Sequence, residues 1–326
     1  MPVLLSEQDV RIVLSMRDLI DAMEIALTRF SAGEVAQPLR TVIEVGLQRA
    51  FVGVMPAFIA DPAALGTKVV SVFGSNTAVG LPTHLATIVL LDPMTGELLA
   101  IMDGRFITEA RTAAVSAVSA KYLARSDAAT LAIIGSGVQA RSHLEAMALV
   151  RNLEDVRVWS RSEDNRTMFA REMQPRVNAP ITVAAAAEEA VDGADLIVLA
   201  TSAREPVVRS EWIADGAHVC AVGACRPDQR EMETDLVRRG RVFVDSRAGA
   251  LAEAGDIVIP LKAGAFDETH LAGELGEILT RRVSARTSPA DVTIFKSLGM
   301  AVEDVVAAHL AYIKAAERGL GRGIVL

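Results

Sequence analysis

The stretch Thr130-Leu-Ala-Ile-Ile-Gly-Ser-Gly-Val-Gln-Ala140 combines an apolar run, a glycine turn and the start of a helix. Leu131–Ile134 has no polar residue, which is typical of a strand buried on both faces of a parallel sheet. In the turn, Gly135 allows backbone angles that a Cβ forbids, Gly137 lets the chain approach a pyrophosphate, and Ala140 keeps the helix close to the strand. The amides at the helix start would face an anion. Because ordinary strand–helix turns also show this pattern, its context decides.

The chain beyond residue 129 alternates between expected strands and helices. After the opening segment we expect a helix to Leu149, a strand at Val156–Trp159 and a helix from about Glu163 to Gln174. Further elements are expected at Ile181–Val183, Ala187–Val191, Leu196–Ala200, His218–Val222 and Val242–Val244. This alternation predicts an α/β fold with a doubly wound parallel sheet of the Rossmann type, and the glycine turn follows its first strand, where a dinucleotide site requires it.

The chain before this region has a different pattern. Met16–Ser31 has a helical apolar face, and the segment from Arg40 to Leu91 is rich in β patterns, which predicts a mostly antiparallel or mixed sheet. An alanine-rich helix, Glu109–Leu123, leads out of this α+β unit. A last helix, Ser297–Ala316, is expected to pack back on it with Met300, Val302, Val306, Leu310 and Ile313 buried. We therefore expect a discontinuous α+β domain, residues 1–113 with 300–326, and a Rossmann domain, residues 114–299.

The composition argues against several classes of partner. The 326 residues suggest two domains at about 150 residues each, and 33 basic against 41 acidic residues, without a basic block, argue against nucleic acid or a membrane surface. No apolar run reaches the ~20 residues of a membrane span, and the acidic N-terminus is unlike a signal peptide, so we expect a cytoplasmic protein. Two cysteines, Cys220 and Cys225, and five scattered histidines show no metal-ligand spacing and predict buried or half-buried thiols without a metal site.

The end of the second strand bears on the type of dinucleotide. Ser160-Arg161-Ser162 offers no carboxylate for the ribose hydroxyls of NAD, whereas the Arg161 guanidinium could stack on adenine and pair with a 2′-phosphate. This favours NADP(H) over NAD(H). The alternative is that Arg161 is a solvated charge at the helix start, beside Glu163 and Asp164.

Several segments together resemble the ornithine cyclodeaminase/μ-crystallin family in order and spacing, from about residue 5 to 318. They are Gln37-Pro-Leu-Arg40-Thr, Gly53-Val-Met-Pro56, Gly66-Thr-Lys68, Pro82-Thr-His84-Leu-Ala-Thr87, Ala110-Arg111-Thr112-Ala-Ala, Gly135-Ser-Gly-Val-Gln-Ala140, Val222-Gly-Ala-Cys-Arg-Pro-Asp228, Glu253-Ala-Gly-Asp256 and Phe295-Lys-Ser-Leu-Gly299. Members of this family include cyclodeaminases, alanine-type dehydrogenases, cyclic ketimine reductases and a thyroid-hormone-binding crystallin.

The resemblance implies a homodimer in which the N-terminal domain binds substrate and pairs the subunits, with the nicotinamide facing the cleft between domains. It places Arg40, Lys68 and Arg111 around a substrate carboxylate, where arginine supplies a bidentate fork and lysine a point charge that can also move a proton. Each cation taken alone could equally be a surface charge or a structural ion pair. His84 is either a core or turn histidine or a proton donor near the nicotinamide. Lys296 is expected to be a structural or phosphate-neighbouring cation.

These considerations give three sets of candidate residues. The catalytic candidates are Lys68 and His84, and the substrate-binding candidates are Arg40, Lys68, Arg111 and Cys225. The cofactor-binding candidates are Thr87, Arg111, Thr112, Gly135, Ser136, Gly137, Val138, Gln139, Ala140, Ser160, Arg161, Ser162, Asn165, Thr201, Ser202, Val222 and Gly223.

Two departures from the family pattern bear on the reaction. Cyclodeaminases carry an aspartate where this chain has Cys225 and a glutamate where it has Gly53, and a thiol and a glycine cannot replace two carboxylates in acid–base work. The segment around Cys225 is similar to the crystallin branch, which implies NADPH-dependent reduction of small cyclic ketimine acids such as Δ1-pyrroline-2-carboxylate and Δ1-piperideine-2-carboxylate to proline or pipecolate. The competing hypotheses are a cyclodeaminase, an alanine-type dehydrogenase, or a non-catalytic protein that binds NADPH and a small acid.

Overall fold

The computed structural model describes residues 1–46 and 50–325, which form two compact units. The first unit comprises Met1–Arg111 and Gly299–Leu326, and the second comprises Thr112–Leu298. The boundaries lie within a few residues of those expected from the sequence. Within the described ranges, no helix combines the length and the apolar character needed to cross a membrane. In the same ranges, no three His, Cys, Asp or Glu side chains gather as potential metal ligands.

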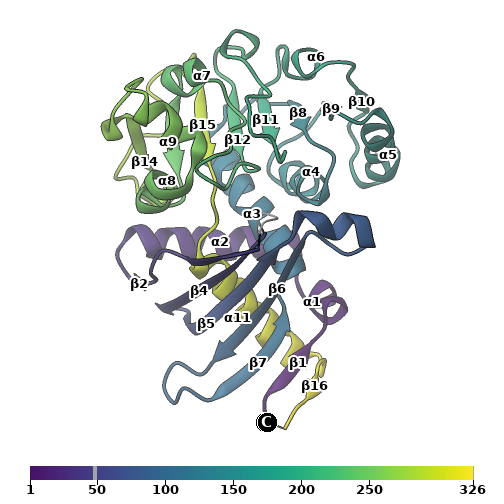
Figure 1. The fold of residues 1–326 in the computed structure, drawn as a ribbon, viewed down its shortest axis with the longest axis vertical. Coiled ribbons are helices and arrows are strands. Elements are labelled where there is room, and N and C mark those ends of the chain that lie inside the picture. Colours follow the sequence, from purple (N-terminus) through teal and green to yellow (C-terminus); the bar gives the residue numbers. More distant parts are fainter. Residues whose placement is uncertain (47–49, 326) are drawn as a thin grey trace. The chain divides into compact units, whose positions relative to one another are not determined.

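A mixed sheet forms the centre of the first unit (Figure 1). Its strands follow the order β16-β1-β7-β6-β5-β4-β2, with β3 also paired to β4, and only the β1–β7 pair is parallel among the described pairs. The mixed sheet predicted from the sequence is thereby confirmed. The strands are β1 (Val3–Leu5), β2 (Val35–Ala36), β3 (Thr41–Val45), β4 (Ala50–Ala60), β5 (Ala63–Val72), β6 (His84–Leu91), β7 (Leu98–Asp103) and β16 (Arg322–Gly323).

Helices cover one face of this sheet. They are α1 (Glu7–Val13), α2 (Met16–Ser31) and α11 (Ala301–Glu317), and α11 packs on α2, β4, β5 and β6. The α2 helix buries Leu19, Met23 and Leu27, which recur every four residues on one side. Gly66 of β5 admits α11 closely, since an added Cβ would lie 3.4 Å from Val305 and 2.7 Å from the Val89 carbonyl oxygen. The expected return of the last helix to the first unit is therefore confirmed.

Two helix boundaries differ from those expected. The last helix begins at Ala301 rather than Ser297, because Gly299 has φ +81° and cannot continue a right-handed helix. Its buried side also differs, since Ile313 is 41% exposed. The α3 helix (Arg105–Leu123) begins four residues before the expected Glu109, and Asp103 Oδ1 accepts a hydrogen bond from the Phe106 amide at its start.

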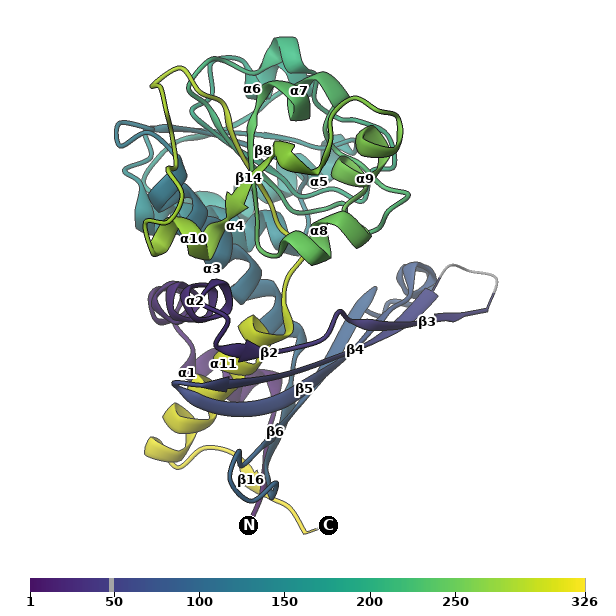
Figure 2. The same ribbon diagram turned by 90° about the vertical axis from the view of Figure 1, so that its left-hand side faces the viewer.

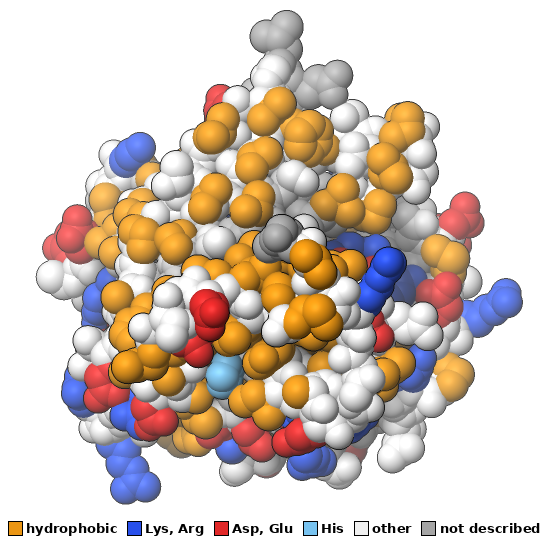
Figure 3. All heavy atoms as spheres, turned by 90° about the horizontal axis from the view of Figure 1, so that it is seen from below, with side chains coloured by type: hydrophobic (Ala, Val, Ile, Leu, Met, Phe, Trp, Pro, Cys, Tyr) orange, Lys and Arg blue, Asp and Glu red, His pale blue; other side chains and the backbone are white. Residues whose placement is uncertain are grey.

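The other face of the first unit's sheet carries hydrophobic side chains. Along β5, Lys68 and Val70 face the helices, while Val69 is 40% exposed on the opposite face. Ile43 and Phe58 are also exposed, at 59% and 37%. Figure 2 shows α1, α2 and α11 on one side of the strands, and Figure 3 shows hydrophobic side chains gathered over this part of the first unit. This surface, called the open face below, is apolar.

The second unit is a doubly wound parallel sheet, as predicted. Its strands follow the order β10-β9-β8-β11-β12-β15-β13-β14, and every described pair is parallel. They are β8 (Thr130–Ile134), β9 (Asp155–Trp159), β10 (Ile181–Val183), β11 (Leu196–Leu199), β12 (His218–Ala221), β13 (Arg241–Val244), β14 (Leu271–Glu274) and β15 (Thr293–Lys296). The sequence did not indicate β14 or β15, although β15 lies between β12 and β13.

Helices and buried apolar clusters lie on both faces of this second sheet. Alternate residues of β8 enter different clusters, Ala132 and Ile134 on one face and Leu131 and Ile133 on the other. This explains why the strand sequence is continuously apolar. The helices are α4 (Val138–Val150), α5 (Glu163–Met173), α6 (Ala187–Val191), α7 (Thr234–Arg239), α8 (Arg247–Glu253), α9 (Gly255–Lys262) and α10 (Leu275–Leu279).

Candidate functional site

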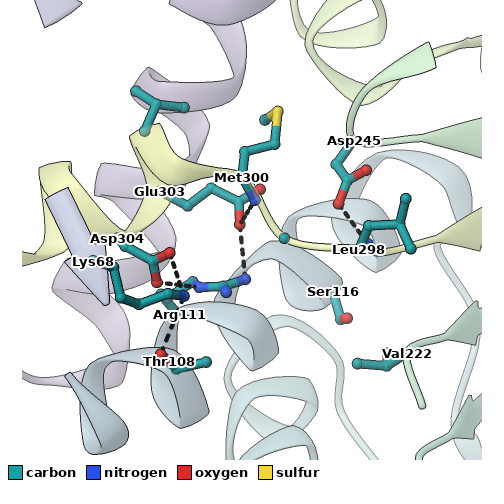
Figure 4. A network of polar contacts seen from close by, with 12 residues as sticks. Lys68, Thr108, Arg111, Ser116, Val222, Asp245, Leu298, Met300, Glu303 and Asp304 are labelled. Atoms are coloured by element: carbon teal, nitrogen blue, oxygen red, sulfur yellow. Dashed lines mark hydrogen bonds and ion pairs between the residues drawn. The ribbon is translucent and has the colours of Figure 1, made fainter. Parts of the chain in front are cut away.

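A buried cluster of opposite charges lies in the first unit (Figure 4). Arg111 of α3 forms ion pairs with two residues of α11, from Nη1 to Glu303 Oε2 at 2.9 Å and from Nε to Asp304 Oδ1 at 2.8 Å. Lys68 of β5 pairs through Nζ with Asp304 Oδ2, and Nζ lies 3.4 Å from Thr108 Oγ1. Two cations and two carboxylates thus compensate one another in the interior, which is the condition for burying charge.

Gly299 lies between the predicted arginines. With φ +81°, it passes so close to Arg111 that an added Cβ would lie 2.5 Å from Nη1. Its carbonyl oxygen accepts a hydrogen bond from Arg40 Nη2 at 3.2 Å. The structure therefore brings Arg40 and Arg111 to the same glycine and joins Arg111 to Lys68 through Asp304. The three cations predicted to surround a substrate carboxylate lie in one region of the first unit.

Lys68 has a lower pKa than an ordinary lysine side chain. Burial lowers the pKa of Lys68 to about 8, and Arg111 and Arg40 act in the same direction, whereas Asp304 raises it. For Asp304, burial raises the pKa, but attraction to Arg111 and Lys68 outweighs burial and leaves its pKa below the usual value. Asp304 is therefore a carboxylate at neutral pH, and Lys68 is an ammonium group that can release a proton at only mildly alkaline pH.

His84 lies on the same face of the sheet as Lys68. The register pairs Val72 with His84 and Lys68 with Ile88, so both side chains point to the helix-covered face. Burial, together with the charges of Lys68 and Arg111, lowers the pKa of His84 to about 4. The imidazole is therefore neutral near pH 7, which favours Lys68 over His84 as an acid. Gly53 also lies on this face, since it pairs with Val70.

The glycine turn of the second unit has the conformation that an anion site needs. Gly135 has φ +127°, and an added Cβ would lie 2.4 Å from the Ala200 carbonyl oxygen, so only glycine fits. Gly137 is the N-cap of α4, has no side-chain cap and borders open space where a Cβ would point. Gln139 Oε1 is buried without a hydrogen-bond partner among the described residues. These features fit a pyrophosphate at the start of α4.

Serines that follow β8 and β9 form a connected chain of hydrogen bonds. Ser136 Oγ donates to Ser160 Oγ at 2.9 Å, which joins the glycine turn to the end of β9, and Ser160 Oγ donates to the Ser162 carbonyl at 3.1 Å. Ser162 caps α5 by accepting from the Asn165 amide at 3.3 Å. The intervening Arg161 side chain is exposed. A basic, solvent-facing residue thus lies beside two hydroxyl groups next to the glycine turn.

The remaining candidates are distributed over both units. Thr87 pairs with Val69 and lies on the open face, opposite to Lys68, and Thr112 is the first residue of the second unit. Cys220 is buried and Cys225 half-buried, both as reduced thiols, and Cys225 Sγ donates to the Val222 carbonyl at 3.3 Å. Thr201, Ser202, Val222 and Gly223 follow the carboxyl ends of β11 and β12.

Lys296 lies in β15, fully buried, with Nζ 3.4 Å from Asp256 Oδ2. Burial lowers the pKa of Lys296, but attraction to Asp256, Cys225 and Glu231 outweighs it, so the pKa is raised overall. A lysine held as an ammonium group cannot act as a base at neutral pH. The expectation of a structural cation agrees with this pairing.

Sequence reasoning missed the carboxylates that hold these sites together. Glu303 and Asp304 come shortly after the Phe295–Gly299 segment but lie in a helix for which the sequence predicts only buried apolar side chains. The sequence signal that could have found them is the adjacent acidic pair in the first turn of a largely apolar helix. Glu231 and Asp256 had no assigned role, although both lie in or beside segments that resemble the family.

Known proteins resemble this chain over nearly its full length. Residues 1–319 match the ornithine cyclodeaminase/mu-crystallin family. The ketimine reductase mu-crystallin of Mus musculus is 43% identical over 315 residues, which is 95% of this chain and 96% of that protein.

Two solved structures share the fold over nearly their full length. The Δ1-pyrroline-2-carboxylate reductase of Thermococcus litoralis, in complex with NADH and L-proline, has a TM-score of 0.97 and 43% identity, covering 99% of this chain and 100% of that one. An archaeal alanine dehydrogenase dimer with bound NAD has a TM-score of 0.95 and 30% identity, covering 99% of each chain. By sequence and by structure, this chain belongs to the ornithine cyclodeaminase/mu-crystallin family.

Proposed function

We propose that this protein is an NAD(P)H-dependent reductase of small cyclic ketimine acids, such as Δ1-pyrroline-2-carboxylate or Δ1-piperideine-2-carboxylate, and forms proline or pipecolate. The observation that carries the proposal is the buried Lys68 ammonium group, with a pKa of about 8, in one region with Arg40 and Arg111. This arrangement supplies positive charge for a carboxylate and a proton for a neighbouring nitrogen. The similarity to a ketimine reductase and to a pyrroline-2-carboxylate reductase supports the same assignment.

The second unit would hold the dinucleotide. The open start of α4 after Gly135 suits the pyrophosphate, and Ser160 and Arg161 suit the adenosine end. When bound, the cofactor would supply a hydride from C4 of the nicotinamide to C2 of the imine. The relative from Thermococcus litoralis binds NADH, whereas the exposed Arg161 and the absence of an acid at this strand end favour NADP(H) here.

The residues of the first unit would bind and protonate the substrate. Arg40 and Arg111 bind the carboxylate, with Arg111 acting largely through its charge because Glu303 and Asp304 engage Nη1 and Nε. Lys68 donates a hydrogen bond or a proton to the imine nitrogen, so that the ring gains a proton at nitrogen and a hydride at carbon. Asp304 keeps Lys68 in the ammonium form and in position. Positioning and charge then supply most of the rate.

Cyclisation of ornithine is a competing reaction, and the chain lacks the side chains that it requires. Gly53 lies on the Lys68 face, where a cyclodeaminase would have a glutamate, and an added Cβ there already lies 3.1 Å from Val70 Cγ1. Where a cyclodeaminase would have an aspartate, this chain has Cys225, whose thiol donates a hydrogen bond to the Val222 carbonyl oxygen. An alanine-type dehydrogenase and a non-catalytic binding protein also occur in this family, and measurements of turnover distinguish these functions from imine reduction.

We expect the purified protein to oxidise NADPH or NADH when Δ1-pyrroline-2-carboxylate is added, with stoichiometric formation of L-proline. Absorbance at the nicotinamide band and chromatography of the amino acid measure the two products independently. Proline formed from ornithine without added reductant would identify a cyclodeaminase and contradict the proposal. Dinucleotide binding without turnover of any imino or keto acid would instead favour the binding protein.

Cofactor preference tests the role of Arg161. If its guanidinium pairs with the 2′-phosphate, Arg161→Asp should raise the dissociation constant for NADPH by roughly 10-fold or more and change that for NADH much less. Calorimetric titration of both cofactors measures this difference. Arg176→Asp makes the same charge change at another exposed arginine of the second unit and should leave the preference unchanged. Equal losses for both cofactors in Arg161→Asp would refute the assignment.

The pH dependence tests Lys68 as the acid. The rate should fall as pH rises through about 8, because the ammonium form is lost above its pKa. Asp304→Asn removes the negative charge that raises the Lys68 pKa, so the alkaline limb of the kcat/KM profile should move to lower pH. Asp18→Asn, which neutralises a partly exposed carboxylate paired with Lys314, should leave that limb in place. A limb that stays in place or moves upward in Asp304→Asn would exclude this role.

The open face predicts a homodimer, in which two copies bury their exposed Ile43, Phe58 and Val69 side chains against each other. Sedimentation equilibrium should give twice the chain mass of 34.6 kDa. Val69→Lys places a charge on this face and should shift the protein toward monomer. Val79→Lys, at an exposed valine outside the strands, serves as the control. A wild-type monomer, or a Val69→Lys protein with an unchanged mass, would contradict this interface.

A further inference from the structure

The Glu231 side chain joins the ends of two neighbouring strands of the second unit. Its Oε1 accepts hydrogen bonds from the Thr201 amide at 2.7 Å and from Thr201 Oγ1 at 2.8 Å. Its Oε2 accepts from the amides of Gly223 at 2.7 Å and Ala224 at 3.2 Å. Since Thr201 follows β11 and Gly223 follows β12, one buried carboxylate fixes the backbone on both sides of the gap between these strands.

Two other buried charges hold Glu231 in place. Asp256 Oδ1 accepts hydrogen bonds from the amides of Glu231 at 2.8 Å and Met232 at 2.9 Å. On its other side, Asp256 Oδ2 faces Lys296 Nζ at 3.4 Å, and Lys296 Nζ donates to the Ala221 carbonyl at 3.3 Å. The contacts therefore run from Gly223, just after β12, through Glu231, Asp256 and Lys296 back to Ala221 at the end of β12. We call Glu231, Asp256 and Lys296 together the Glu231 clamp.

At two positions of the clamp, Gly223 and Gly255, the backbone is packed too closely for a side chain. An added Cβ at Gly223 would lie 1.9 Å from the Thr201 carbonyl oxygen and 2.6 Å from Glu231 Oε1. An added Cβ at Gly255, which precedes Asp256, would lie 1.9 Å from the Gln229 carbonyl oxygen. Two glycines are thus required for the clamp to close. A close-packed polar network of this kind rigidifies what it holds.

The clamp lies at the edge of the sheet where a dinucleotide would bind. Gly135, Thr201 and Gly223 come shortly after β8, β11 and β12, which are neighbours in that order. In a parallel sheet of this type, ligands bind beyond the carboxyl ends of the strands. With the pyrophosphate at the glycine turn after β8 and the adenosine end beside β9, the nicotinamide end falls beyond β11 and β12.

We propose that Glu231 is a positioning residue that presets the backbone of Thr201, Gly223 and Ala224 for the nicotinamide end of the cofactor. The inference deepens the proposed function and relies on its dinucleotide site. No atom of Glu231 needs to touch the cofactor, because its four accepted hydrogen bonds act on the segments that do. Rigid placement of the ring matters for hydride transfer, where small displacements cost rate.

The test compares two ligands that differ in the nicotinamide. ADP-ribose carries the adenine, both riboses and both phosphates of NADH but no nicotinamide. Glu231→Gln keeps the size of the side chain, but its amide nitrogen cannot accept from backbone N–H groups. We expect the dissociation constant of NADH, measured by calorimetric titration, to rise about 10-fold, while that of ADP-ribose changes less than about 2-fold. The kcat of imine reduction should fall more than KM for the imine rises.

A matched control lies at the opposite edge of the same sheet. Asp195 Oδ2 accepts hydrogen bonds from the amides of Ala129 at 2.9 Å and Thr130 at 3.0 Å, at the amino ends of β11 and β8. Asp195→Asn therefore weakens a comparable carboxylate–amide link far from the carboxyl edge. It should lower the melting temperature of the protein without changing the ratio of NADH to ADP-ribose affinities.

The outcomes separate the inference from the proposed function. Equal losses for both ligands in Glu231→Gln, no loss for NADH, or the same selective loss in Asp195→Asn would overturn the positioning role. If Glu231→Gln does not fold, Glu231→Asp takes its place, because it keeps the charge but is one methylene shorter. We expect the same selective loss of NADH affinity in this variant, and the same outcomes would overturn the positioning role. Wild-type protein that binds no dinucleotide would overturn both proposals, whereas wild-type protein that binds NADH but reduces no imine would overturn only the proposed function.

Discussion

The first unit depends on the mutual compensation of four buried charges. Lys68, Arg111 and the Glu303–Asp304 pair come from β5, α3 and α11, so the cluster links the two separate chain segments that make up this unit. Removal of one member of such a cluster leaves an uncompensated buried charge, which costs about 3–5 kcal/mol. The same interaction therefore stabilises the discontinuous unit and sets the proton equilibrium of Lys68. A substitution in this cluster is therefore expected to change both the stability of the first unit and the pKa of Lys68.

Local sequence was sufficient where local physics determines the structure. The continuous apolar run Leu131–Ile134 and the glycines after it predicted a strand buried on both faces and a turn that only Gly135 can form, and the structure has both. The α2 helix begins and ends at Met16 and Ser31, as its apolar spacing and the Gly33 beyond it predicted. The spacing of buried apolar residues and the steric limits of the backbone act within a few residues, so the local sequence is sufficient to predict these elements.

Contacts between distant residues were not predictable in this way. Nothing near Asp304 in the sequence indicates that it pairs with Lys68, and nothing near Glu231 indicates four donors from Thr201, Gly223 and Ala224. The predicted start of α11 was wrong because Gly299 takes a left-handed conformation where it passes over Arg111. Packing against a distant residue causes this conformation, and helix propensities do not describe such packing. Carboxylates that act on backbone amides or distant cations become visible only when the fold is known.

The distribution of carboxylates favours reduction over cyclisation on physical grounds. Glu303 and Asp304, which lie beside Lys68 and Arg111, are both engaged in ion pairs, and Glu231 in the second unit accepts four hydrogen bonds. Each is thereby committed to holding other groups in place, and none resembles a base poised to take a proton from an amine. Reduction of an imine needs no such base, because it requires a proton donor and a positioned hydride. In the proposed reaction, Lys68, which pairs with Asp304 and so keeps its ammonium form, would be this donor.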